Sequence, residues 1–233
     1  MKLILVVPCY NEEKILESSI TKLYKYMEDN IKHSWDIIIA NNASTDNTKH
    51  IANKLASKLL HVKAVHLKVK GRGNALKYVW SNYDSDVYAY CDVDLATNIT
   101  HLNELCDYII FGKNIVIGSR YLKYSNAKRN IRRFILSKGY NYLMKLLFRT
   151  KIKDLQCGFK AIDKKIVKDL LPKIKNKKWF FDSELIIRAE RLKKYKIKEI
   201  PVKWSENKNS KVKIFETVYE FIINSIKLRK ELK

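Results

Sequence analysis

The chain of 233 residues is 46% hydrophobic and 30% charged, which is typical of a folded globular protein and excludes a disordered one. No apolar run approaches the roughly 20 residues of a membrane-spanning helix, and no cleavage-site pattern follows the apolar residues 3–7. The four cysteines lack C-x-x-C spacing and a disulfide-like framework. The sequence therefore predicts a cytoplasmic protein that neither enters the secretory route nor spans a membrane.

The formal net charge of +23 lies almost entirely in the second half of the chain. Residues 1–118 hold 14 Lys and Arg against 13 Asp and Glu, whereas residues 119–233 hold 33 against 11. A basic half suggests nucleic acid, an anionic membrane surface or a phosphorylated substrate as partner. The alternative is a lysine-rich surface on solvated helices.

Strands and helices alternate over the first half of the chain. Apolar, β-prone runs predict strands at residues 3–7, 35–40, 62–67, 88–91 and 115–118, and helical periodicity predicts helices at 13–28, 47–60, 76–82 and 102–110. This alternation indicates a parallel, doubly wound sheet.

The second half is predicted to be mainly helical. We expect helices at residues 131–148, 164–171, 182–192 and 212–232, a loop at 153–161 and an edge strand at 197–204, because Pro201 cannot donate to a ladder. No repeat or Gly/Ser linker divides the chain. We expect a single domain over 1–233, with a charge-balanced half (1–118) and a basic half (119–233).

Polar clusters follow four of the predicted strands, at residues 8–12, 41–46, 70–75 and 92–98. Ligands of open α/β sheets bind beyond the carboxyl ends of the strands. We therefore expect these four clusters to share one edge of the sheet and to form one site.

The last cluster contains Asp92 and Asp94 directly after a strand. Carboxylate oxygens suit hard cations such as Mg²⁺ or Mn²⁺, so the pair is a candidate metal site. Ordinary loop or helix-cap aspartates are the alternative.

A set of motifs is spread over nearly the whole chain: VPCYNEE, the Asn/Ser/Thr/Asp turn at residues 41–46, KGRGNAL, DVDLAT, GSRYL, the Arg133 to Ser137 R-x-x-x-S, DLQCGFKA, WFFDSEL and IPVKW. These motifs and their order resemble those of family 2 glycosyltransferases of the polyprenyl-phosphate type. The pair DLQCGFK and WFFDSEL is most similar to dolichyl-phosphate glucose synthases and less so to the mannose synthases. The resemblance implies a nucleotide-sugar-binding half (1–118) and a basic half (119–233) that faces the acceptor and the membrane.

This resemblance implies a GT-A fold, an α/β architecture with a Rossmann-like, mostly parallel sheet flanked by helices and with amphipathic C-terminal helices. It also implies an inverting transfer of glucose or an N-acetylhexosamine from a UDP-sugar to dolichyl or polyprenyl phosphate, which yields a lipid-linked sugar for protein glycosylation. Asp92 and Asp94 would hold Mg²⁺ or Mn²⁺ against the diphosphate. A GDP-mannose-dependent mannose synthase is the alternative of the same class.

The resemblance also assigns donor-binding residues. Those expected to bind the nucleotide sugar are Pro8, Tyr10, Asn11, Glu12, Asn41, Arg72, Gly73, Asp92 and Lys211, and those expected near the donor sugar are Asp182 and Glu184. Plain turns and helix starts are the alternative interpretation of these residues. Asn41 stands where the family commonly has Asp, which leaves the identity of the base open.

Arg120, Arg133 and Ser137 match positions that bind the lipid phosphate in the family. Arginine suits this role because its planar fork binds phosphate in bidentate fashion. The implied catalytic set is thus Asp92, Asp94, Arg120 and Arg133. A phosphate monoester is already anionic at neutral pH, so we expect no general base.

A polyprenyl chain stays in its membrane, so the enzyme must come to it. We expect peripheral binding at the cytoplasmic face through the basic amphipathic helices at 131–148 and 212–232, although core packing also explains their apolar spacing. A basic nucleic-acid-binding module is the rival of another class, and a sugar-nucleotide-binding protein without activity is a third hypothesis. We expect no nucleic-acid partner, because the clustered polar loops lie in the neutral half.

Overall fold

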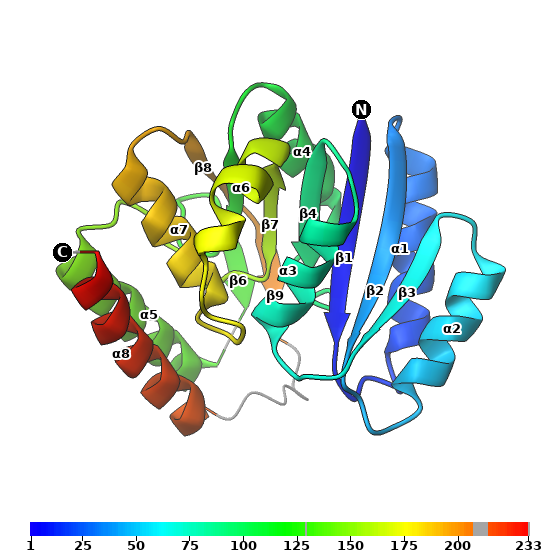
Figure 1. Cartoon of the computed structure of the whole chain (residues 1–233), viewed down its shortest axis with the longest axis horizontal. Coiled ribbons are helices and arrows are strands. Elements are labelled where there is room, and N and C mark those ends of the chain that lie inside the picture. The colour runs from blue at the N-terminus through cyan, green and yellow to red at the C-terminus, as the bar shows by residue number, and fades with distance from the viewer. Residues whose placement is uncertain (129, 207–213, 233) are drawn as a thin grey trace.

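In a computed structural model, which describes residues 1–128, 130–206 and 214–232, a seven-stranded sheet crosses the molecule in the order β3-β2-β1-β4-β7-β5-β8 (Figure 1). Its neighbouring strands pair in parallel except at β7, which is antiparallel to both β4 and β5. The strands are β1 (Lys2–Cys9), β2 (Ser34–Asn42), β3 (Val62–Leu67), β4 (Val87–Cys91), β5 (Ile115–Ser119), β7 (Phe159–Asp163) and β8 (Ile197–Pro201). The expected α/β fold with a mostly parallel sheet is confirmed.

Helices cover both faces of this sheet because its central strands are apolar on both sides. The residues of β1 alternate between two buried clusters, one on each face. Helices α1 (Leu16–Asn30), α2 (Thr48–Lys58) and α4 (Leu102–Ile110) cover one face, and α3 (Arg72–Asn82), α6 (Lys164–Asp169) and α7 (Phe181–Leu192) cover the other. Short 3-10 turns span Ile99–His101 and Leu171–Lys173.

Helices α5 (Ile131–Phe148) and α8 (Ile214–Glu231) lie side by side at the outer edge of the second layer (Figure 1). The rings of Tyr140 and Phe221 have centroids 4.7 Å apart, and the Ser225 hydroxyl donates to the sulfur of Met144 at 3.2 Å. On each helix the second contact lies four residues after the first, so the two helices run parallel. None of the helices in the described part of the chain is both long and apolar enough to cross a membrane.

The main topological error of the sequence prediction is β7. Residues 153–161 were expected to form a loop, but Phe159–Asp163 inserts as a strand between β4 and β5. The strand is short, and its second residue, Lys160, is charged although it is fully buried, so the hydrophobicity pattern does not reveal a strand. The insertion makes the sheet mixed.

Element boundaries also differ from the sequence prediction. Strand β1 continues through Pro8 to Cys9, where it still pairs with β2. Its pairing with β4 ends at Val6, so a proline, which has no backbone N–H, is tolerated at position 8. Helix α3 begins at Arg72, four residues earlier than expected, whereas α1 begins three residues later, at Leu16.

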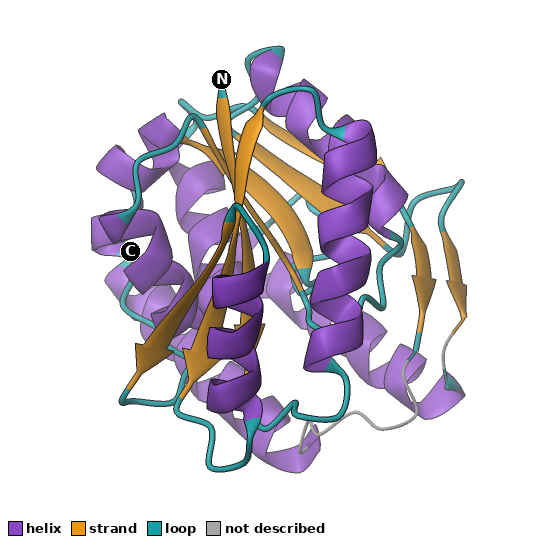
Figure 2. Cartoon of the chain, turned by 90° about the vertical axis from the view of Figure 1, so that its right-hand side faces the viewer, coloured by secondary structure: helices purple, strands orange, loops and turns teal. Residues whose placement is uncertain are grey.

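The expected edge strand at 197–204 is two strands. β8 occupies the edge of the main sheet as predicted, and β9 (Lys203–Ser205) pairs with β6 (Asn126–Lys128). This two-stranded sheet stands apart from the main one (Figure 2).

Candidate active site

The four polar loops gather at the carboxyl ends of β1 to β4, at the lower edge in Figure 1. The backbone N–H of Asn11 donates to the Ser44 hydroxyl at 2.9 Å, which joins the first loop to the second. The N–H of Gly71 donates to the side chain of Asn42 at 2.8 Å, which joins the second loop to the third. The expectation that these loops share one edge is confirmed.

Asp92 and Asp94 lie directly beyond β4 at this edge. The N–H of Asp92 donates to the carbonyl of Gly158 at 3.1 Å, and a Cβ at position 158 would lie 1.7 Å from Asp92 Oδ2. Only glycine leaves room for the carboxylate in this position. Asp94 Oδ1 accepts a hydrogen bond from the N–H of Ala96 at 3.1 Å.

The carboxylate of Asp94 is not neutralised within the site. Burial and the nearby charge of Asp92 raise the pKa of Asp94 to about 6. Within the described ranges, no group of three or more His, Cys, Asp or Glu could hold a metal by itself. Two adjacent carboxylates fit a hard cation that completes its shell with phosphate oxygens and water, as Mg²⁺ commonly does.

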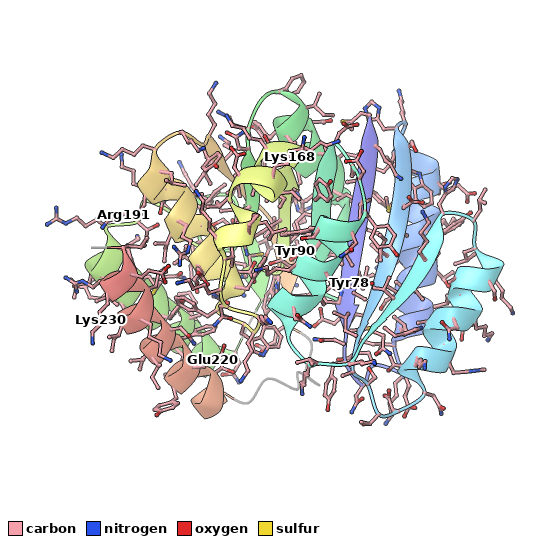
Figure 3. All side chains as sticks on the ribbon, in the orientation of Figure 1. Tyr78, Tyr90, Lys168, Arg191, Glu220 and Lys230 are labelled. Atoms are coloured by element: carbon pink, nitrogen blue, oxygen red, sulfur yellow. The ribbon has the colours of Figure 1, made fainter. Side chains whose placement is uncertain are left out.

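Arg72, the first residue of α3, lies beneath the loop that carries Asp92. Its Nη2 is 2.9 Å from the Tyr90 hydroxyl and 3.5 Å from both Asp92 Oδ1 and Asp182 Oδ2. Burial lowers the Arg72 pKa, but the charge of Asp92 and its other partners outweigh this and raise it, so the guanidinium stays charged. Tyr90 lies near the centre of the molecule (Figure 3).

The two acidic residues at the start of α7 have different surroundings. Asp182 is fully buried beside Arg72, within the same set of contacts as Asp92. Glu184 instead accepts hydrogen bonds from the N–H groups of Lys175 and Asn176, at 3.0 and 2.8 Å, and from Arg188 Nε at 2.8 Å. Its contacts fix the loop before α7, so a role of Glu184 in binding the donor sugar rests on the resemblance alone.

In the first loop, the ring of Tyr10 packs against the ammonium group of Lys70. The Lys70 ammonium lies 3.4 Å from the centroid of the Tyr10 ring. Asn11 adopts a left-handed backbone conformation with φ 55°, and its side chain accepts from the N–H of Thr45 at 2.8 Å. The N–H of Glu12 donates to the Thr48 hydroxyl at 2.8 Å. Lys70 is a site residue that the sequence analysis missed, although its basic loop was noted.

Asn41 is buried where its loop leaves β2. Its side-chain nitrogen lies 3.1 Å from His66 Nδ1, and its oxygen accepts from the N–H of Ser44 at 3.2 Å. Both ends of the amide therefore have protein partners. Burial, helped by the charge of Lys49, lowers the pKa of His66.

The residues expected to bind the lipid phosphate are only partly described. The Arg120 guanidinium forms a bidentate pair with Asp154, at 2.7 and 2.8 Å, so its fork already faces a carboxylate. The Ser137 and Tyr121 hydroxyls are 2.5 Å apart. The backbone of Arg133 belongs to α5, but its side chain and the whole of Lys211 lie outside the described residues.

Comparisons with known proteins agree with this architecture. Residues 4–171 match the family described as glycosyl transferase family 2. The chain is 31% identical to glycosyltransferase AglD of Haloferax volcanii over 91% of its own length and 34% of that protein. It is 32% identical to dolichyl-phosphate beta-glucosyltransferase ALG5C of Trichomonas vaginalis over 90% of its length and 65% of that protein. The chain thus spans about a third of the first relative and just under two thirds of the second.

A solved structure shares the fold. Glucosyl-3-phosphoglycerate synthase from Mycobacterium tuberculosis, in complex with Mn²⁺, UDP and phosphoglyceric acid, superposes with a TM-score of 0.75 at 16% identity. The match covers 98% of this chain and 78% of that one. At this identity, the likeness establishes the GT-A-like fold and nothing of the substrate.

Proposed function

Because the chain belongs to glycosyl transferase family 2, as the match over residues 4–171 shows, we propose that it transfers a hexose from a UDP-sugar to a polyprenyl or dolichyl phosphate, with inversion. Glucose and N-acetylhexosamines are the sugars we favour. The names of its dolichyl-phosphate glucosyltransferase relatives support glucose. The observation that carries the proposal is the pair Asp92 and Asp94 at the carboxyl edge of the sheet, with a buried arginine beneath it.

Asp92 and Asp94 would hold Mg²⁺ or Mn²⁺, which when bound stabilises negative charge on the leaving UDP. Arg72 is positioned to add a second positive charge at the diphosphate. Gly73 follows Arg72 in the first turn of α3, and its N–H donates to the carbonyl of Lys178 at 3.2 Å. We assign the Tyr10 loop and Asn41 to the nucleoside.

The acceptor phosphate supplies its own nucleophile. One of its anionic oxygens forms a bond to the anomeric carbon as the bond from that carbon to the UDP oxygen breaks, so no side chain needs to remove a proton. Arg120, Arg133 and Ser137 are the residues we assign to this phosphate, with Arg120 held by Asp154. We assign Lys211 to the diphosphate of the donor.

We also propose that the protein binds the cytoplasmic face of an anionic membrane through α5. Four large apolar side chains follow one side of this helix and are 62–69% exposed: Ile131, Ile135, Tyr142 and Leu146. The helix carries four basic residues and no acidic one. An apolar stripe flanked by positive charge is the pattern of a helix that lies in an anionic lipid interface.

The proposal is tested by incubating the purified protein with a panel of UDP- and GDP-sugars, Mn²⁺ and a short polyprenyl phosphate. We expect transfer from UDP-glucose or a UDP-N-acetylhexosamine, and Asp94→Ala should abolish it while the protein stays folded. Transfer only from GDP-mannose would assign the mannose synthase activity instead. No transfer from any donor, with nucleic-acid binding that Asp94→Ala leaves intact, would favour the nucleic-acid module.

A further inference from the structure

Lys160 is a fully buried lysine at the centre of the molecule. It lies on β7 directly opposite Tyr90 on β4, and both side chains point into the layer beneath α7. The Lys160 ammonium is 3.0 Å from Asp182 Oδ1 and 3.3 Å from the Tyr90 hydroxyl, and it also donates to the carbonyl of Cys157. A buried ammonium is costly, so such a residue requires these partners.

Its partner Asp182 connects Lys160 to the candidate metal site. One carboxylate oxygen of Asp182 faces Lys160 and accepts from the Tyr90 hydroxyl, and the other faces Arg72 at 3.5 Å. Arg72 in turn lies 3.5 Å from Asp92. The side chains form one continuous chain of contacts from Lys160 to Asp92.

The charges along this chain are balanced. Two cations, Lys160 and Arg72, face two carboxylates, Asp182 and Asp92. Arg72 is shared between the two carboxylates at equal distances, and its Nε has no hydrogen-bond partner among the described residues. The contacts with Tyr90, Asp92 and Asp182 all involve Nη2, and the ring centroids of Tyr90 and Trp179 each lie 5.0 Å from Cζ. The balance of charge around Asp182 therefore decides how far the guanidinium leans toward Asp92.

We propose that Lys160 is a positioning residue for the candidate metal site. By neutralising Asp182, it prevents this carboxylate from drawing Arg72 entirely to itself, and thereby keeps Arg72 against Asp92 at the edge where the donor binds. The inference rests on the proposed function, in which Asp92 holds the metal and Arg72 faces the diphosphate. It assigns a positioning role to Lys160, and to the Tyr90 hydroxyl that contacts Arg72, Asp182 and Lys160, which neither the motifs nor the comparisons assign.

The test uses the donor-free protein and measures Mn²⁺ binding by electron paramagnetic resonance and UDP binding without metal by calorimetry. In Lys160→Met, Arg72 moves toward Asp182, and Asp92 loses its cation. We expect Mn²⁺ to bind about tenfold more tightly and UDP to bind about tenfold more weakly, a change of the size that outer-shell partners contribute. Arg72→Met should change both affinities in the same direction.

The double variant separates positioning from a general charge effect. If Lys160 acts through Arg72, Lys160→Met should add little to Arg72→Met. Lys164→Met, which removes an exposed lysine paired with Asp84, is the matched control and should change neither affinity. Tyr90→Phe keeps the ring and removes the shared hydroxyl, so it provides a second test if Lys160→Met does not fold.

Unchanged Mn²⁺ and UDP affinities in folded Lys160→Met or Tyr90→Phe would overturn the proposal and leave these residues a structural role. Additive effects in the double variant would overturn it too. Wild-type protein that takes up no Mn²⁺ would overturn both this inference and the metal role of Asp92, whereas failure of the variants alone would leave the proposed function intact.

Discussion

Asp154 accepts two hydrogen bonds from the guanidinium of Arg120, from Nε at 2.7 Å and Nη2 at 2.8 Å, and a third from the Arg120 backbone N–H at 3.0 Å. Asp154 is fully buried, and the Arg120 side chain is 13% exposed. The pair ties the end of β5 to the segment before β7. Arg120 also lies over the ring of Trp204, with Cζ 5.4 Å from its centroid, so the pair reaches the β6–β9 sheet.

This pair predicts a pH-dependent contribution to stability. Burial alone would raise the Asp154 pKa, but the charge and hydrogen bonds of Arg120 outweigh it and hold the pKa below its ordinary value of 3.8. A carboxyl group whose pKa is lowered in the folded state stabilises the fold at pH values above its unfolded-state pKa. This stabilisation is lost as pH falls through the folded-state pKa. Asp154→Asn removes the negative charge that faces this buried guanidinium, so it should lower the free energy of unfolding by about 3–5 kcal/mol at pH 7.

Urea unfolding at pH 7 and at pH values below 4 measures this effect, and the difference between wild type and Asp154→Asn should shrink at the lower values. Asp84→Asn is the control, because Asp84 pairs with Lys164 at the surface and should matter little. Equal costs for the two substitutions would contradict the assignment of Arg120 and Asp154 as a structural pair.

Gly158 predicts a second, more local effect. An alanine Cβ at this position would lie 1.7 Å from Asp92 Oδ2 and 2.7 Å from Oδ1, so the carboxylate must move. Displacing a reacting group by about 1 Å costs roughly 100-fold in rate. We therefore expect Gly158→Ala to lower metal-dependent transfer by at least about 100-fold, as measured with the best donor at saturating Mn²⁺, while circular dichroism stays native.

The matched control is Gly139→Ala in α5, where nothing lies within 4 Å of the added Cβ. It should retain full transfer and raise the free energy of unfolding by about 0.5–1 kcal/mol, because alanine favours the helix. Native transfer in Gly158→Ala would show that Asp92 does not have to keep its observed position.

Asn41 predicts a change in a neighbouring histidine. Asn41→Asp would place a negative charge about where the amide now lies, 3.1 Å from His66 Nδ1. An adjacent carboxylate favours the charged imidazole, so the His66 pKa, now lowered by burial and the charge of Lys49, should rise. A histidine whose pKa is raised in the folded state stabilises the fold below its unfolded-state pKa, and this stabilisation is lost as pH rises through the folded-state pKa. The variant should therefore be more stable, relative to wild type, at pH 6 than at pH 8.

Nuclear magnetic resonance titration of His66 measures this pKa directly. Asn82→Asp serves as the control, since Asn82 donates to the Tyr78 carbonyl at the end of α3, whereas the side chains that hydrogen-bond to His66 are those of Asn41 and Asn53. An unchanged His66 pKa in Asn41→Asp would mean that the new carboxylate turns away from the ring.

The parts of the site that were predicted correctly depend on local patterns. A buried strand that ends in polar residues predicts a loop at the sheet edge, and this was enough to bring Asp92, Asp94 and the Arg72 loop together. The resemblance added the order of the motifs. The positions of the loops and the identity of the motifs can both be read from short stretches of sequence.

The parts that were missed depend on pairs far apart in the chain. Arg120 and Asp154 are separated by 34 residues, and Tyr90 and Lys160 by 70. A lysine on a short strand suggests exposure, because only the tertiary structure supplies the buried carboxylate that neutralises it. For the same reason, the pairing of Arg120 with Asp154 was not expected, and the contact of Arg120 with a phosphate stays a prediction.

The exposed stripe on α5 predicts binding to anionic vesicles. Ile135→Glu combined with Leu146→Glu removes two apolar groups and adds two negative charges at the proposed interface, so vesicle affinity should fall by about tenfold or more. Leu60→Glu combined with Phe111→Glu makes the same change at side chains that are 73% and 80% exposed elsewhere, and should have a much smaller effect. Co-sedimentation with phosphatidylserine vesicles measures both, and transfer to a short water-soluble acceptor should stay native. Equal losses in the two double variants would show that net charge, and not α5, governs membrane binding.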